Sequence, residues 1–140
     1  MDFLWIDTQN KLYQAELELR LKVLRLPIGM ENLEKFPFEE DSLHLLAIKD
    51  GQVIGCVLFY QKGNGGRLYQ MAVAKEQQSK GIGKKLVKEL EKKLKLLGVK
   101  SVTIHAREPV IGFYKKLGYK VYTERFEEIG IPHRKMYKDL

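Results

Sequence analysis

The spacing of apolar positions predicts two long helices and one short one. Apolar residues recur at helical spacing over residues 9–26 and 84–97, where they form one face of each segment. Thr8 is the expected N-cap of the first helix. A short third helix is expected between Pro109 and Gly118. The apolar face of the second long helix comprises Ile82, Leu86, Leu90, Leu94 and Leu97.

Shorter apolar runs, rich in β-branched and aromatic residues, predict strands between these helices. The runs are residues 3–7, 43–49, 52–60, 67–74, 99–106, 119–127 and 133–138. Asp50-Gly51 joins the second run to the third and is typical of a tight hairpin. Residues 27–42 predict an irregular connection that lines a substrate entrance. We therefore expect one α+β domain over residues 1–140, with a mixed, mostly antiparallel, twisted sheet flanked by helices.

Charge is unevenly distributed along the chain. The formal net charge is +7, and the window from Lys75 to Lys100 contains nine lysines against three acidic residues. A solvated helix face is one explanation of this window. Attraction for a polyanion, either nucleic acid or a small phosphorylated cofactor, is the other. Charge alone does not decide between them.

The residue types present exclude several kinds of site. Cys56 is the only cysteine, so no intramolecular disulfide can form, which suits the reducing cytoplasm that we expect as the location. One cysteine and three scattered histidines provide no ligand set for a structural metal, and no metal is predicted. The apolar runs are too short to span a bilayer, and the N-terminus lacks the basic region of a signal peptide.

The clearest chemical signal is a glycine-containing loop between a predicted strand and the second long helix. The first N–H groups of a helix lack acceptors and, with the helix dipole, favour an anion. Gly81 and Gly83 carry no Cβ, so a pyrophosphate can approach the backbone, and lysines add positive charge. A dinucleotide fingerprint is excluded because the next strand ends in Arg107 and not in an acid. A Walker A loop is excluded because Gly83-Lys84-Lys85 lacks the hydroxyl that binds magnesium.

Two motifs carry a resemblance to a known family. Gln78-Ser79-Lys80-Gly81-Ile82-Gly83 resembles the Gln/Arg-x-x-Gly-x-Gly/Ala pyrophosphate loop of the GNAT superfamily of N-acetyltransferases. Phe113-Tyr114-Lys115-Lys116-Leu117-Gly118-Tyr119 is similar to the second signature of that family, Phe-Tyr-x-x-x-Gly-Phe/Tyr. Gly130-Ile131-Pro132-His133 is similar to a small ElaA-like branch. Many members carry an asparagine before the Phe-Tyr pair where this chain has Arg107, so no role is carried over from it.

The resemblance implies an N-acyltransferase that moves an acetyl group from acetyl-CoA to a primary amine by direct attack in a ternary complex. The Val73 N–H would polarise the thioester carbonyl, and the Tyr114 hydroxyl would protonate the departing thiolate. Each residue also fits a purely structural role, Val73 in a core strand and Tyr114 on a helix face. The cofactor would be held by Met71, Ala72, Val73, Gln78, Ser79, Lys80, Gly81, Ile82, Gly83, Lys84, Phe113 and Tyr114.

The group that accepts the proton of the amine stays open among Glu108 and the three histidines, His44, His105 and His133. His133 is preferred because it follows Gly-Ile-Pro, although a lone histidine on a strand also fits a structural role. Five charged residues either shape the acceptor pocket or are solvated surface charges. They are Arg20, Arg25, Glu39, Glu40 and Asp41.

The acceptor itself is not identified by the sequence. A small-molecule amine and a peptide or protein amine both fit, and the acidic run Glu39-Glu40-Asp41 hints at a cationic acceptor. Relatives commonly form homodimers. Two rival functions remain, a CoA-binding sensor without turnover and a nucleic-acid-binding domain that uses the lysine-rich helix. That helix has no interleaved aromatics and no base-reading face, so neither nucleic acid nor membrane is the expected partner.

Overall fold

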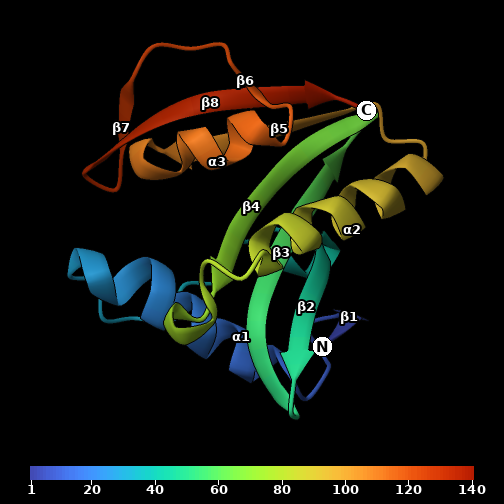
Figure 1. Ribbon diagram of the computed structural model, residues 1–140, viewed down its shortest axis with the longest axis vertical. Coiled ribbons are helices and arrows are strands. Elements are labelled where there is room, and N and C mark those ends of the chain that lie inside the picture. The colour runs from blue at the N-terminus through green and yellow to red at the C-terminus, as the bar shows by residue number, and fades with distance from the viewer.

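One mixed sheet of eight strands organises the computed structural model, which describes residues 1–140 (Figure 1). Seven strands follow the spatial order β1-β2-β3-β4-β5-β8-β6, and β7 pairs with β8. All neighbours are antiparallel except β4 and β5, which are parallel. The strands are β1 Asp2–Ile6, β2 Leu43–Lys49, β3 Gln52–Lys62, β4 Gly65–Val73, β5 Ser101–Arg107, β6 Lys120–Val121, β7 Phe126–Glu128 and β8 Ile131–Asp139.

Three α-helices flank this sheet, α1 Tyr13–Arg20, α2 Ile82–Leu96 and α3 Ile111–Lys116. Short 3₁₀ turns cover Leu26–Ile28, Glu39–Asp41, Lys75–Gln77 and Glu108–Val110. No helix is long and apolar enough to cross a membrane.

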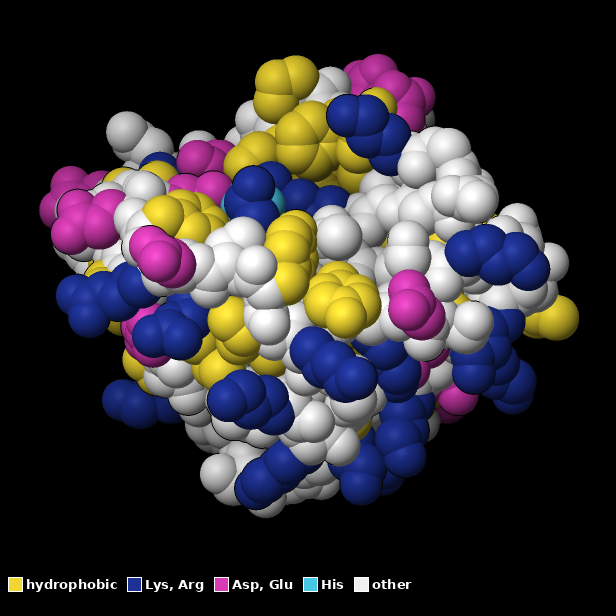
Figure 2. All heavy atoms as spheres, turned by 90° about the horizontal axis from the view of Figure 1, so that it is seen from above, with side chains coloured by type: hydrophobic (Ala, Val, Ile, Leu, Met, Phe, Trp, Pro, Cys, Tyr) yellow, Lys and Arg dark blue, Asp and Glu magenta, His cyan; other side chains and the backbone are white.

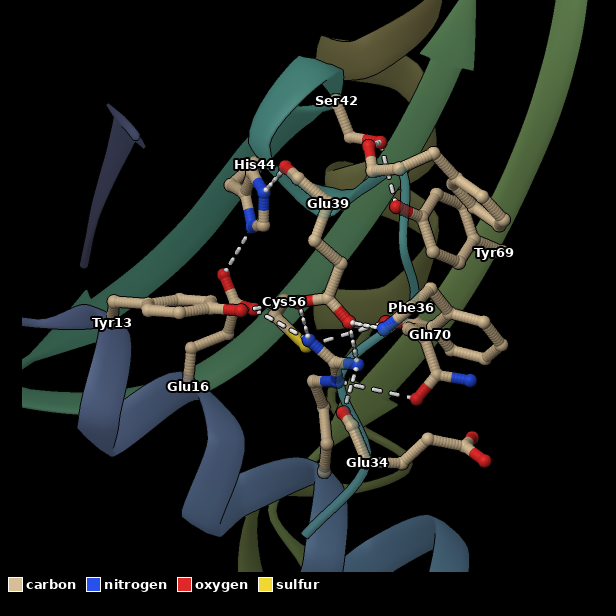
Figure 3. Close-up of polar contacts among 12 residues, drawn as sticks. Tyr13, Glu16, Glu34, Phe36, Glu39, Ser42, His44, Cys56, Tyr69 and Gln70 are labelled. Atoms are coloured by element: carbon tan, nitrogen blue, oxygen red, sulfur yellow. Dashed lines mark hydrogen bonds and ion pairs between the residues drawn. The ribbon is translucent and has the colours of Figure 1, made fainter. Parts of the chain in front are cut away.

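Helices α1 and α2 cover opposite faces of the β2–β4 part of the sheet (Figures 1 and 3). A Cβ at Gly55 of β3 would lie 2.9 Å from Cδ1 of Leu86, so this position faces α2 at very close range. Its neighbour Cys56 faces the other way, toward the side chains of α1 (Figure 3). The predicted apolar stripe of α2 is buried from Ile82 to Leu94, whereas Leu97 is largely exposed. Burial of that stripe fixes α2 against the sheet.

The first helix is shorter than its apolar pattern predicts. Its N-cap position is Leu12, without a side-chain cap, and not Thr8. The Asp7 carboxylate accepts the N–H of Gln9 at 2.9 Å, and the Asn10 side-chain oxygen accepts the N–H of Leu12 at 2.9 Å. Such local bonds favour turns over helix, so residues 9–12 stay outside α1. At the other end, Leu21–Arg25 continue α1 as a π-helical turn.

The C-terminal strands also differ from the prediction. Residues 119–127 contain two short strands, β6 and β7, and β8 begins at Ile131 instead of residue 133. Ile129 and Gly130 join β7 to β8 with φ angles of 50° and 74°. Two consecutive residues with positive φ are typical of a tight hairpin turn. An Ile-Gly pair does not predict such a turn from the sequence. The predicted Asp50-Gly51 hairpin has the same geometry, with φ of 51° and 74°.

Strands β4 and β5 are paired over only two positions. Arg67 lies beside Thr103 and Leu68 beside Ile104, and beyond these pairs the strands diverge (Figure 1). Between Cys56 and Leu58 the β3–β4 register shifts, so β4 has one extra residue opposite Val57. Gln70 occupies this bulge with φ of 52°, an uncommon angle for a residue other than glycine. The bulge bends β4 where it leaves β5.

Candidate active site

A cavity of about 910 Å³ lies where β4 and β5 diverge. Its lining comes from β4, the loop into α2, the end of β5, the region around the start of α3, the β7–β8 hairpin, the π-helical turn after α1 and the connection from that turn to β2. Ligand sites usually have volumes of about 300–1,000 Å³, so the space suits a large substrate or two smaller ones. Every residue predicted for cofactor binding lines this cavity except Lys80, and of the candidate catalytic residues only Glu108 and His44 lie outside its lining.

The edge of β4 presents backbone groups to this side. The Ala74 N–H donates to Ile54 O at 2.8 Å, which makes residues 74 and 54 a hydrogen-bonded pair. In an antiparallel ladder the adjoining pair, Val73 and Gly55, then directs its backbone groups away from the partner strand. The Val73 carbonyl accepts the side-chain amide of Gln78 at 3.0 Å. Strand β5 pairs with β4 only as far as Leu68. The N–H groups of Val73 and Met71 therefore have no strand partner on this side.

The predicted pyrophosphate loop has a concave backbone. Ser79 and Gly81 have φ angles of 65° and 81°, and Gly81 is the N-cap of α2 without a side-chain cap. Left-handed residues in such a loop turn successive N–H groups toward one point and form an anion-binding nest. A Cβ at Gly83 would lie 3.3 Å from Cζ of Phe113 and 3.4 Å from Cε of Met71. Glycine at this position therefore lets α2 approach α3 and β4, and the loop fits a pyrophosphate.

Tyr114 of α3 lines the cavity. The side chain is 4% exposed, and burial raises the pKa of its phenol. Its hydroxyl has no hydrogen-bond partner within the chain, yet it is not among the fully buried unpaired atoms, so it touches the cavity space. A phenol held protonated and unpaired in this way can donate a proton or a hydrogen bond.

His133, His105 and Glu128 form a cluster in the cavity wall. The Nδ1–H of His133 donates to Ile131 O at 2.8 Å, and its Nε2 lies 3.5 Å from Oε2 of Glu128. The Nδ1 of His105 lies 3.0 Å from the other carboxylate oxygen of Glu128. His133 is 3% exposed and lines the cavity. Its Nε2 can accept a proton, because the nearby carboxylate stabilises the resulting cation and Ile131 O holds the ring in place.

Two pKa directions agree with this arrangement. Burial alone would raise the pKa of Glu128, but the hydrogen bond from His105 and the charges of His105, Arg67 and His133 hold the pKa below its usual value. Burial lowers the pKa of His105, and the charges of Arg67 and Lys135 act in the same direction against the attraction of Glu128. The carboxylate therefore stays ionised while His105 stays neutral near pH 7.

Glu108 and Lys80 lie outside the cavity lining. The Glu108 carboxylate accepts the Nε–H of Arg134 at 3.2 Å, and this partly exposed pair belongs to the surface. Lys80 is exposed and donates to the side chain of Gln77 at 3.4 Å. Sequence reasoning, in turn, missed lining residues from other elements, among them Glu34, Phe36, Arg67, Gln70 and Glu128. Nothing in their sequence context separates Arg67 or Glu128 from ordinary surface charges.

A buried ionic network supports the α1 side of the cavity (Figure 3). Arg20, only 2% exposed, donates through Nη1 to Glu16 and Glu39, each at 2.9 Å, and through Nη2 to Glu39 at 2.7 Å. The remaining Nη2 bond goes to Glu34 O at 2.9 Å, and the Nε bond to the side-chain oxygen of Gln70 at 3.2 Å. Glu34 and Gln70 both line the cavity. Arg20 and Glu39 are therefore internal framework residues and not solvated surface charges.

His44 completes this network and balances its charge. The Nδ1 atom lies 2.8 Å from a carboxylate oxygen of Glu16, and Nε2 lies 2.8 Å from Glu39 O. Both partners are acceptors, so both ring nitrogens carry protons and His44 is cationic. Burial alone would lower the pKa of His44, but the bonds and charges of Glu16 and Glu39 raise it. Two carboxylates then face two cations, and because His44 does not line the cavity its role is structural.

Comparison with known proteins agrees with this geometry. The family model described as Acetyltransferase (GNAT) domain matches residues 26–140. The uncharacterized protein YyaT of Bacillus subtilis (strain 168) is 30% identical over 139 residues, which cover 96% of this chain and 93% of that protein.

Solved structures share the fold, and the α+β class with a mixed sheet is confirmed. The structure of Escherichia coli ElaA has a TM-score of 0.87 at 18% identity and covers 98% of each chain. The PaiA N-acetyltransferase of Thermoplasma acidophilum, solved in complex with coenzyme A, has a TM-score of 0.76 at 19% identity and covers 100% of each chain.

Proposed function

Because the chain belongs to the GNAT family of acetyltransferases, we propose that it moves the acetyl group of acetyl-CoA to a primary amine by direct attack in a ternary complex. One observation carries this proposal. A cavity formed by the separation of β4 from β5 brings a free backbone edge, an unpaired tyrosine hydroxyl and a histidine–glutamate pair around one space. The whole chain, residues 1–140, acts as one such domain.

Acetyl-CoA binding is assigned to β4 and the loop after it. The N–H groups around Ser79, Gly81 and Gly83 bind the pyrophosphate, as the left-handed backbone of Ser79 and Gly81 and the missing Cβ atoms of the two glycines allow. The outward backbone groups of Met71 and Val73 bind the amides of the pantetheine arm. The CoA complex of the PaiA structural neighbour supports this assignment. The thioester supplies the activated acetyl group, and no metal enters the proposal.

The proton of the attacking amine passes to His133. An alkyl amine with a pKa of about 10.4 is protonated near pH 7, so the site must accept a proton before attack. The Nε2 of His133 is positioned to receive it, directly or through one water. The Glu128 carboxylate then stabilises the imidazolium, and the hydrogen bond from Nδ1 to Ile131 O keeps the ring oriented. Glu108 is left in its surface ion pair with Arg134.

The charge that develops on the thioester is stabilised by two groups. The Val73 N–H, which points away from β3, polarises the carbonyl oxygen during attack. The Tyr114 hydroxyl donates its proton to the departing thiolate. Burial keeps this phenol protonated, so the donor is present across the physiological pH range.

The test separates binding from turnover. The protein should gain thermal stability with CoA, by about 2.7 kcal/mol at a concentration 100 times the Kd. It should also release thiol from acetyl-CoA in the presence of at least one member of a broad amine panel. His133→Ala should keep the CoA affinity and lose most of the turnover. Binding without turnover on any amine would indicate a CoA sensor, and absence of both would refute the whole proposal.

A further inference from the structure

The acceptor end of the cavity contains two arginines without acidic partners. Arg67 occupies one of the two positions at which β4 pairs with β5, and Arg107 ends β5. Arg107 pairs in the sheet with His133, so it lies next to the proposed proton acceptor. Viewed from above, basic side chains and a small area of histidine lie beside hydrophobic side chains in a recess of this face (Figure 2). Both arginines line the cavity.

The guanidinium of Arg67 is the unexplained group of this site. Arg67 makes no hydrogen bond or ion pair with any other side chain, and its Nε is the one fully buried side-chain nitrogen or oxygen without a partner. The guanidinium carbon lies 5.9 Å from the centre of the Tyr69 ring. Buried donors in proteins are almost always paired. An orphan donor in a cavity wall therefore indicates a ligand group that accepts hydrogen bonds.

Arg107 is only partly satisfied. Its Nη2 donates to Leu24 O at 2.9 Å, and it forms no ion pair with a carboxylate. Burial lowers the pKa of Arg107, the charges of Glu128 and Glu34 oppose this lowering, and the positive charge of Arg25 reinforces it. A bound anion in contact with the guanidinium would offset the burial, because it adds a counter-charge at hydrogen-bond distance.

The acidic residues of the cavity are already engaged. Glu34 pairs with Arg25 at 3.1 Å. Glu128 lies within 3.0 Å of His105 and 3.5 Å of His133. Glu39, which suggested a cationic acceptor in the sequence, is enclosed in the network around Arg20 and does not line the cavity. The site therefore offers a polycationic acceptor no free carboxylate, whereas it offers an anionic acceptor two arginines.

We propose that the acceptor carries an oxyanion, a carboxylate in the first instance, that Arg67 and Arg107 bind while its amine faces His133. This assignment rests on the acetyl transfer proposed above. The planar guanidinium matches a carboxylate or phosphate by paired hydrogen bonds, which an amine acceptor without an anionic group cannot form. The acceptor class is thus an amino acid or a similar amino-carboxylate, and Arg67 is a specificity-determining residue.

The first experiment measures kcat/KM by thiol release for matched acceptors, namely phenylalanine, phenylalaninamide and phenethylamine, with the corresponding series built on other amino acids. The kcat/KM for the free amino acid should exceed the values for its amide and for its decarboxylated amine by at least ten-fold. Arg67→Met should lower kcat/KM for the free amino acid at least ten-fold more than for the decarboxylated amine while leaving the acetyl-CoA affinity unchanged, and Arg67→Lys should restore part of the preference. Arg134→Met is the matched control, because Arg134 loses the same charge outside the cavity lining.

A second measurement does not depend on turnover. Inorganic phosphate, at constant ionic strength, is titrated into the CoA-saturated protein by calorimetry, and Arg67→Met should weaken its binding by ten-fold or more while Arg134→Met changes little. Phosphate binding without thiol release would refute the proposed function and leave the anion site intact. Turnover without preference for the acid, or a preference that survives Arg67→Met, would overturn the anion site and leave acetyl transfer intact.

Discussion

Two buried tyrosines, one in α3 and one just after it, provide a sharp test of the chemistry. Tyr114 and Tyr119 have ring centroids 5.7 Å apart, and both are almost fully buried. The hydroxyl of Tyr114 has no partner in the chain, whereas that of Tyr119 donates to Glu91 at 2.7 Å. Replacing each with phenylalanine removes one oxygen and keeps the packing of the ring. Tyr114→Phe should therefore lower activity and preserve stability, whereas Tyr119→Phe should lower stability and preserve activity.

For Tyr114→Phe we expect a loss confined to turnover. Protonation of the thiolate strengthens only as charge develops on sulfur, so its loss lowers kcat more than it raises KM. A thiol with a pKa of about 8.5 is already a fair leaving group, which places the effect near the lower end of general-acid catalysis, about 10²-fold. That factor corresponds to about 2.7 kcal/mol in the activation free energy. The free energy of unfolding should change little, because no intramolecular hydrogen bond is broken.

For Tyr119→Phe we expect a loss of stability with unchanged turnover. A hydrogen bond to a charged group contributes about 1.5–3 kcal/mol to the free energy of unfolding. Glu91 keeps its bonds from Lys138 at 2.9 and 3.1 Å, so the structure around it should persist with normal kcat. Steady-state kinetics and urea unfolding of both variants provide the measurement. Full kcat in Tyr114→Phe, or a loss seen only in KM, would refute the acid role and leave solvent or the acceptor as the proton source.

Two further changes test the cofactor loop and the buried network. Gly83→Val places side-chain atoms against Phe113, whose ring lies only 3.3 Å from where a Cβ would be, and should weaken CoA binding in calorimetry by ten-fold or more, about 1.4 kcal/mol. The control is Gly112→Val, where a Cβ meets nothing within 4 Å, and it should keep the CoA affinity. If Gly83→Val binds CoA as tightly as Gly112→Val, the pyrophosphate is bound elsewhere. The pKa of His44 is raised by Glu16, so its stabilising contribution is full below about pH 6.5 and is lost as pH rises through the higher folded value. The difference in free energy of unfolding between wild type and His44→Asn should therefore shrink with rising pH, and a constant difference would show that His44 is not cationic.

The elements with a strong local signal were predictable. The stripe of α2 and the loop before it follow from apolar spacing and from glycines whose positions have a steric reason, and twelve of the proposed site residues line one cavity. The start of α1 was not predictable, because Asp7 and Asn10 form local bonds that compete with helix while the apolar pattern continues through them. The hairpin at Ile129 was missed for a related reason, since β-branched residues rarely adopt positive φ.

The burial of the charged network could not be predicted from the sequence, for a different reason. Glu16 and Arg20 are four residues apart on a helix, a spacing that usually indicates an exposed ion pair. Their burial depends on Glu39 and His44, which reach them from segments more than twenty residues away along the chain from Glu16. A pattern within one helix does not contain that information. Sequence could supply the candidate residues for the network but not their common position inside the protein.

The same network explains how a strained residue persists at the site. Gln70 has a φ of 52°, which costs about 1–3 kcal/mol and persists only where its surroundings fix it. Arg20 fixes it from the α1 side through the 3.2 Å bond to its side-chain oxygen, and Cys56 donates to Gln70 O at 3.3 Å. The resulting bulge turns β4 away from β5 just past the two positions where they pair. The cavity and its free backbone edge thus depend on α1, although α1 itself contributes no group to the proposed chemistry.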